Sequence, residues 1–309
     1  MICPQCQHEN ADDALSCSIC GTTLQEINDE STDPATTTYR TPSGQDPPPL
    51  PHGGFGDLFD STFSVYGGHL LPFILIALLP QIPILFGGIT SLMEIGPVFN
   101  LEFPTTPGEE PQEPLPLYLF DVLGGLLSFA VGILASGAMI QSVGRHFLGR
   151  PVLVQRSYEY AWARFPKLLG AFALVMLILL VPLVLSFFII GIPVLIFAVV
   201  VLLFSTHAVA IEQLGPTDAV KRSWNVVQGN WWRTFGYFMA IMLAIIGATI
   251  LIFLPAGRYL PSILIVPLST AFSAVVTPLV TIAITVLYFH IRVQKEQYTH
   301  SDLARELGD

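Results

Sequence analysis

Four cysteines lie close together near the start of the chain, and thiolates are strong ligands for transition metals. They form two Cys-x2-Cys pairs, Cys3 with Cys6 and Cys17 with Cys20, separated by ten residues. Each pair can place two thiolates on one metal, and two pairs complete the tetrahedral four-sulfur shell that zinc favours. Such a shell leaves no open position for a substrate, so we expect a structural zinc ion in a zinc ribbon over residues 1–24. A redox dithiol pair and iron bound by the same ligands are the alternatives.

The residues around the cysteines indicate where this zinc ribbon works and what it contacts. The chain opens without the basic and apolar regions of a signal peptide, so we expect a reducing compartment, where metal binding is favoured over disulfides. Residues 1–39 contain seven acidic residues and no Lys or Arg. Because phosphate binding needs basic side chains, we expect contact with a protein partner and not with nucleic acid. His8 is expected to be a bystander, since four cysteines already fill the shell.

Histidines and carboxylates at the ends of apolar stretches are the other residues with possible chemistry. Glu212 and Asp121 could belong to a proton or ion pathway, but at span ends a charged side chain costs little. Four histidines, which we interpret as isolated interfacial residues with a second metal site as the alternative, are His69, His146, His207 and His290. The sequence has no Gly-rich phosphate loop, no G-x-S-x-G elbow and no H-E-x-x-H helix. We therefore expect a protein that is not an enzyme.

The apolar stretches between these groups are long enough to cross a membrane. Of the 309 residues, 52% are hydrophobic and 12% are charged, whereas a soluble domain has about 25% charged residues. A spanning helix needs about 20 apolar residues, so the 44 uncharged residues between Lys167 and Glu212 predict two spans with a turn at Gly191-Ile192-Pro193. The sequence predicts an all-α integral membrane protein with about six transmembrane helices, over residues 68–92, 117–141, 168–189, 193–212, 234–255 and 265–289.

The remaining segments complete the domain order and give its orientation. Residues 25–54 are rich in Ser, Thr, Asp, Gln and Pro, which predicts a disordered linker before a membrane domain over 55–295 and a tail over 296–309. Only Arg258, of thirteen basic residues, falls on the side of the membrane opposite to the others. By the positive-inside rule, both termini are expected to be cytoplasmic, in a multi-pass protein of the cytoplasmic (inner) membrane.

The chain matches itself at an offset of 66 residues. Arg156-Ser157-Tyr158 pairs with Arg222-Ser223-Trp224, and each copy places an amphipathic segment before a span. A third, weaker copy precedes the first span, with Gly68 aligned to Gly229. The expected architecture is three parallel units of an interfacial helix and a hairpin, with chance matches among basic and aromatic interfacial segments as the alternative. The residues expected to contact lipid or its headgroups are Arg156, Arg222, Trp224, Trp231, Trp232 and Arg233.

Two stretches, residues 219–232 and 287–296, resemble a bacterial multi-span membrane family. The family includes the membrane domain fused to some glycerophosphoryl diester phosphodiesterases, and the resemblance covers roughly residues 55–300. His290 and Gln294 stand where the family commonly has Asp and a second Arg. The chain has no room for the catalytic domain, which is a separate barrel of about 250 residues, so the resemblance implies a membrane domain without that activity. Residues 1–24 resemble the short zinc ribbons of many bacterial membrane proteins.

These observations predict a non-catalytic membrane scaffold or regulator that contacts membrane lipids and docks a cytoplasmic protein through its zinc ribbon. The acidic zinc ribbon, the linker and the lack of a catalytic motif favour this function. The alternative is a transporter or lipid-handling protein, which parallel repeats and proline-interrupted spans would suit.

Overall fold

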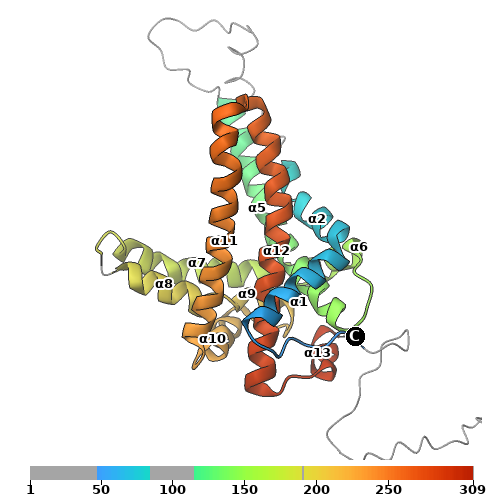
Figure 1. The fold of residues 1–309 in the computed structure, drawn as a ribbon. Coiled ribbons are helices and arrows are strands. Elements are labelled where there is room, and N and C mark those ends of the chain that lie inside the picture. Colours follow the sequence, from blue (N-terminus) through green and yellow to red (C-terminus); the bar gives the residue numbers. More distant parts are fainter. Residues whose placement is uncertain (1–46, 84–114, 190, 309) are drawn as a thin grey trace, which may run out of the picture. The chain divides into compact units, whose positions relative to one another are not determined.

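The computed structural model describes residues 47–83, 115–189 and 191–308, which Figure 1 shows as a ribbon. In these ranges the chain forms helices and turns, with no strand, so the all-α prediction is confirmed for them. The four cysteines and the predicted linker up to residue 46 lie outside the described residues. The helices are α1 (Phe55–Gly68), α2 (Leu70–Leu78), α5 (Leu115–Phe147), α6 (Val154–Ala163), α7 (Phe165–Leu185), α8 (Gly191–Leu202), α9 (Ser205–Ala210), α10 (Pro216–Val227), α11 (Trp231–Tyr259), α12 (Ser262–Glu296) and α13 (His300–Leu307).

Several helices of the described residues are long and apolar enough to cross a membrane. Because lipid offers no hydrogen bonds, a spanning segment must satisfy its backbone internally, as a helix does. These five stretches support a multi-pass membrane protein, and they are Val122–Phe147, Phe165–Leu185, Gly191–Ala210, Trp231–Tyr259 and Pro267–Glu296.

The first predicted span begins with a sharp break between two helices. α1 and α2 meet at His69 with a bend of 82°. If this bent pair counts as one span, the described residues contain six candidate spans instead of five. Pro72 explains the break, since it lacks an N–H and its ring would clash with the carbonyl of Gly68 in a continuous helix. Residues 84–92 of that predicted span lie outside the described part of the chain.

Burial separates the candidate spans into two kinds. Within an apolar window of 18 residues, 44% are buried in α5, in α8–α9 and in α12, but 17% in α7 and 11% in α11. The well-buried helices meet through aromatic rings: the ring centroids of Phe147 and Phe289 lie 5.6 Å apart, and those of Phe204 and Tyr288 lie 5.3 Å apart. α5, α8–α9 and α12 therefore form the core of the helical domain, and α7 and α11 flank it.

Each of the amphipathic helices α1, α6 and α10 packs on one of the core helices. The Ser157 hydroxyl of α6 lies 2.8 Å from that of Ser142 in α5, and the Ser223 hydroxyl of α10 donates to the Val201 carbonyl in α8 at 2.6 Å. α1 packs on α12, where the Tyr66 hydroxyl donates to the Val275 carbonyl at 3.0 Å. α6 and α10 thus contact the core helix that precedes them, and α1 contacts the last one, which closes a ring of three units.

The same burial pattern runs through the three amphipathic helices. In the register that pairs Gly68 with Gly229, a small hydroxyl residue is buried at the same place in each: Thr62, Ser157 and Ser223. At the seventh residue of the helices that follow, Ile76, Ala171 and Tyr237 are all buried in the same register. This is the pattern that three repeated units would produce.

The end of the predicted linker is packed rather than free. Residues 47–54 run without helix before α1, and Leu50 is only 6% exposed. Nε2 of His300 in α13 lies 2.9 Å from the Pro48 carbonyl, and the Tyr237 hydroxyl donates to the Gly54 carbonyl at 3.4 Å. The sequence did not predict this segment as packed, because its polar and proline-rich composition hides the single apolar side chain that anchors it.

Candidate functional site

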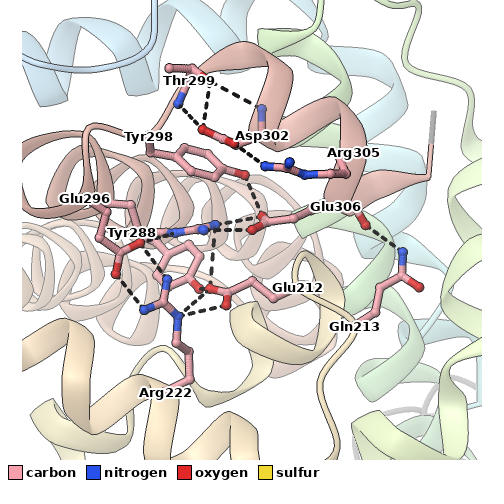
Figure 2. Close-up of polar contacts among 11 residues, drawn as sticks. Glu212, Gln213, Arg222, Tyr288, Glu296, Tyr298, Thr299, Asp302, Arg305 and Glu306 are labelled. Atoms are coloured by element: carbon pink, nitrogen blue, oxygen red, sulfur yellow. Dashed lines mark hydrogen bonds and ion pairs between the residues drawn. The ribbon is translucent and has the colours of Figure 1, made fainter.

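A network of charged side chains joins two regions that are distant in the sequence, residues 212–222 and residues 292–306 (Figure 2). Glu212 follows α9, Arg222 lies on α10, Arg292 and Glu296 lie in the last turns of α12, and Glu306 lies on α13. Arg292 and Glu296 are four residues apart, so the helix places them on one face. The αL residue Gln297 ends α12 there, and Thr299 caps the N-terminus of α13, which turns Glu306 back toward Arg292.

Arg222 is held between two carboxylates. Its Nε lies 2.8 Å from both carboxylate oxygens of Glu212, and its two terminal nitrogens each donate to one oxygen of Glu296 at 2.6 Å. The planar guanidinium fits such paired acceptors better than an ammonium group would. Burial lowers the pKa of Arg222, but the hydrogen bonds that it donates to Glu296 and Glu212 outweigh burial and raise the pKa, so this side chain stays charged.

Arg292 is the most buried charge of the network, with 5% of its side chain exposed. It donates to both oxygens of Glu306 at 2.8 Å and to Glu296 at 3.2 Å, and it lies 3.6 Å from Glu212. Its guanidinium carbon also lies 3.7 Å from the ring centroid of Tyr298, a cation–π contact. A charge this buried is tolerated because it is paired and hydrogen-bonded on several sides.

Two tyrosines and one glutamine complete the network. The Tyr288 hydroxyl donates to Glu212, and the Tyr298 hydroxyl donates to Glu306 at 2.6 Å. Burial raises the pKa of Tyr298, so the phenol remains a neutral donor. The Gln213 amide donates to the backbone carbonyl of Glu306 at 2.6 Å. Every charged group of the network therefore has a partner, and the arrangement fastens helix ends together rather than presenting a free nucleophile or base.

Gln213 and Gln297 stand at matching places in the chain. In the described residues, the non-glycine residues with positive φ are these two, with φ of 58° and 54°. Each follows a glutamate, Glu212 and Glu296, that binds Arg222. The Glu-Gln pair was visible in the sequence as a repeated dipeptide after a core helix, and it is the signal that could have revealed this network.

The structure places the predicted headgroup anchors in different surroundings. Arg156 is exposed, as an anchor must be, whereas the guanidinium of Arg222 is occupied by Glu212 and Glu296. This finding argues against the anchoring role that we expected for Arg222. The repeat places the two arginines at equivalent positions, but it is Arg222 that forms ion pairs with two carboxylates.

The three tryptophans expected to contact lipid differ in their exposure. Trp224 is 49% exposed and Trp232 is 77% exposed, as expected for interfacial side chains. Trp231 is half-buried and stacks on Phe197 and Phe235 at centroid distances of 5.7 and 5.1 Å. Arg233 donates to Gln294, so it ties α11 to α12.

The histidines and acids at the span ends are spread over the domain. His69 and His146 are neighbours, with ring centroids 5.1 Å apart. His207 and His290 are buried at other places, and in the described ranges no three His, Cys, Asp or Glu residues are grouped to hold a metal. Of the two acids considered for a proton pathway, Glu212 is bound by Arg222, and Asp121 belongs to α5. Sequence reasoning singled out Glu212 and Arg222 but missed Arg292, Glu296, Glu306 and Tyr298.

Comparisons with known proteins place the chain in a family. Neither a search of curated proteins nor a search of solved structures finds a match. The model of the family described as Domain of unknown function (DUF7847) matches residues 58–292. The match includes Glu212, Arg222 and Arg292 and ends before Glu296 and Glu306. Because the match covers most of the chain, the chain belongs to the DUF7847 family.

Proposed function

We propose that this protein is a non-catalytic scaffold or regulator of the cytoplasmic membrane, with a zinc ribbon that docks a cytoplasmic protein. Cys3, Cys6, Cys17 and Cys20 would bind one structural zinc ion, and both termini would lie in the cytoplasm. The spacing of the cysteines and the distribution of the basic residues support this arrangement. We also propose that the helical domain is related to the membrane domain of the glycerophosphoryl diester phosphodiesterases.

The observation that carries the proposal is that α13 contacts two parts of the domain. These are residues 47–54, at the end of the predicted linker, and the network of charged side chains. On α13, His300 contacts Pro48 and Glu306 binds Arg292 at 2.8 Å. The same helix, α13, therefore binds the end of the predicted linker through His300 and contributes Glu306 to the network. If residues 25–46 form the disordered tether that their composition predicts, the random-coil rule would give these 22 residues a reach of roughly 25 Å. Such a geometry keeps a docked partner close to one face of the membrane domain.

The chemistry of the network also supports a role without catalysis. A general base or nucleophile needs a lone pair or proton available to a substrate. In the network, the carboxylates of Glu212, Glu296 and Glu306 are bound by arginines. A set of charges paired in this way stabilises one arrangement of helices, which suits a scaffold.

A lipid-handling protein is the second candidate function, favoured by one groove. The groove has a volume of about 490 Å³, lies between α5 and α7, and begins near the Phe129–Phe172 ring pair, whose centroids are 5.0 Å apart. Its lining is apolar: Phe129, Leu169, Phe172, Ala173, Met176, Leu177 and Leu180. It would fit an acyl chain and offers nothing to bind a polar substrate.

Zinc content and partner capture test the proposed function together. The full-length protein should contain one zinc per chain, and the Cys17→Ser/Cys20→Ser variant should contain none, because two thiolates cannot hold zinc in a four-sulfur shell. His8→Ala is the matched control and should keep its zinc. Proteins captured from the cytoplasm by the native protein and by His8→Ala should be lost with the double variant.

The outcomes separate the two candidate functions. Zinc retained by the double variant would refute the four-thiolate site. Equal capture by all three proteins would refute docking through the zinc ribbon and would move the lipid-handling function ahead. A lipid acyl chain that copurifies with native protein and is lost on Ala173→Trp, which fills the groove, would support that second function directly.

A further inference from the structure

The turn between α7 and α8 differs from the other hairpin turn that the structure describes. Phe187, Phe188 and Ile189 form this turn and are 89%, 70% and 85% exposed. No charged residue occurs between Lys167 and Glu212. The turn between α11 and α12, by contrast, is flanked by Arg258 and by Tyr259, which is 81% exposed. An exposed apolar turn without a charged residue is suited to hydrocarbon and not to water.

Several backbone groups of the α7–α8 turn are hydrogen-bonded within the turn itself. The N–H groups of Phe187 and Phe188 donate to the carbonyls three residues earlier, at 3.3 and 2.9 Å. Gly191 N–H donates to the Phe188 carbonyl at 2.7 Å, and the Ser186 hydroxyl donates to the Leu183 carbonyl at 2.6 Å. Irregular backbone is tolerated in hydrocarbon only where its polar groups are bonded without water. The bonded N–H groups of Phe187, Phe188 and Gly191 meet that requirement.

The hairpin is also short. α7 has 21 residues and α11 has 29, which correspond to about 31 Å and about 43 Å of helix. The hydrocarbon core measures about 30 Å, and the whole bilayer with its headgroups about 40–45 Å. α7 starts beside Arg164 and Lys167, basic residues of the kind that favour the level of the headgroups. An upright α7 would therefore end near the far edge of the hydrocarbon, and any inclination would end it deeper inside.

The direction of the hairpin decides between these cases. In Figure 1, α7 and α8 run at a wide angle to α11 and α12. If α11 and α12 cross the membrane, the inclined hairpin cannot reach the far surface. α7 has only 17% of its apolar window buried, so most of its sides are free to meet lipid.

We propose that the α7–α8 hairpin enters the membrane and returns without crossing it, with its tip at Phe187–Ile189 in contact with lipid acyl chains. The hairpin is then a wedge in the bilayer, and the hydrocarbon chains of membrane lipids cover its exposed apolar side chains. Both ends of the hairpin lie on the same side in either case, so the distribution of basic residues is equally compatible with it. The wedge does not depend on the zinc ribbon or on its partner.

Thiol labelling in sealed vesicles tests the depth of the tip. Phe187→Cys probes the tip of α7–α8, and Tyr259→Cys is the matched control, an equally exposed aromatic at the end of α11. A charged maleimide should label Tyr259→Cys from one aqueous side. It should label Phe187→Cys from neither side, or at least about tenfold more slowly, because a charged reagent is excluded from hydrocarbon. Peptide mass analysis locates the label, so the native cysteines can remain.

Spin labels at the same two positions provide the second measurement. Collisions with oxygen, which concentrates in hydrocarbon, should exceed collisions with a water-soluble nickel chelate at position 187, and the order should reverse at position 259. Labelling of Phe187→Cys at a rate similar to that of Tyr259→Cys, or a nickel-dominated signal at position 187, would overturn the wedge and leave two full spans.

Discussion

At the scale of single residues, the two repeated arginines show how one residue type acquires two roles. Arg156 and Arg222 precede a buried serine at the same place in their helices. Arg156 faces outward, whereas Arg222 finds Glu212 ten residues before it and Glu296 far along the chain. The difference arises from the carboxylates that follow α9 and end α12, since the repeat that contains Arg156 has His146-Phe147 where the repeat that contains Arg222 has Glu212-Gln213.

Replacement of these two arginines should therefore have unequal effects on stability. Arg222→Ala removes the closest arginine partner of Glu212 and Glu296 in a half-buried place and leaves both carboxylates to Arg292 and Tyr288. We therefore expect a loss of about 2–4 kcal/mol in the free energy of unfolding. Arg156→Ala removes an exposed side chain and should change it by less than about 0.5 kcal/mol. Thermal unfolding of both variants in the same detergent measures the difference. Equal destabilisation would show that the network does not hold the helix ends.

At the scale of elements, the interruption between α8 and α9 depends on a residue from another helix. The helical ladder breaks at Leu203 and Phe204, which frees a backbone donor and an acceptor. The Ser223 hydroxyl accepts from the Phe204 N–H at 3.0 Å and donates to the Val201 carbonyl at 2.6 Å. One side chain thus replaces the backbone bonds that the break removes, as a buried break requires.

The paired serines give a direct test of this role. Ser223→Ala leaves the Phe204 N–H and the Val201 carbonyl without that partner, so we expect a loss of about 2–3 kcal/mol. Ser157→Ala is the control, because α5 is continuous there and Ser142 still donates to the Ala138 carbonyl at 2.7 Å. It should cost about 1 kcal/mol. Chemical unfolding followed by tryptophan fluorescence compares the two, and a larger loss for Ser157→Ala would contradict the bridging role of Ser223.

At the scale of the whole helical domain, three units close into a ring with their amphipathic helices at one end. α5, α8–α9 and α12 make the core, and α13 is an additional helix that packs on α5 near Gly144. The nearest atom to a Cβ added at Gly144 would be Cδ1 of Leu307, at 2.9 Å. The small residue at position 144 of α5 thus leaves room for the Leu307 side chain where α13 packs.

The orientation of this domain is a prediction that labelling can check. Ser301, which is exposed on α13, should be labelled from the cytoplasmic side after Ser301→Cys, because basic residues gather at that end. Thr105→Cys, in the acidic stretch outside the described residues, should be labelled from the opposite side. External labelling of Ser301→Cys in intact cells would reverse the proposed orientation.

The sequence by itself determined the features that depend on local composition. Long uncharged stretches predicted helices because a bilayer allows only segments that satisfy their own backbone. The repeated Arg-Ser-aromatic triplet predicted α6 and α10 as amphipathic helices, and both are helices of that kind. Four cysteines in two pairs predicted a zinc ligand set, which remains a prediction.

Only the tertiary structure decided which distant groups meet. Arg222 and Glu296 are separated by 74 residues, and their contact depends on how α10 and α12 pack rather than on either local sequence. The break at Leu203 is stable because a serine from α10 lies beside it, and no pattern within α8 reveals that neighbour. The inclination of α7 and α8 follows from packing at their base, since length and apolar character are the same for a crossing helix and for one that turns back inside the membrane.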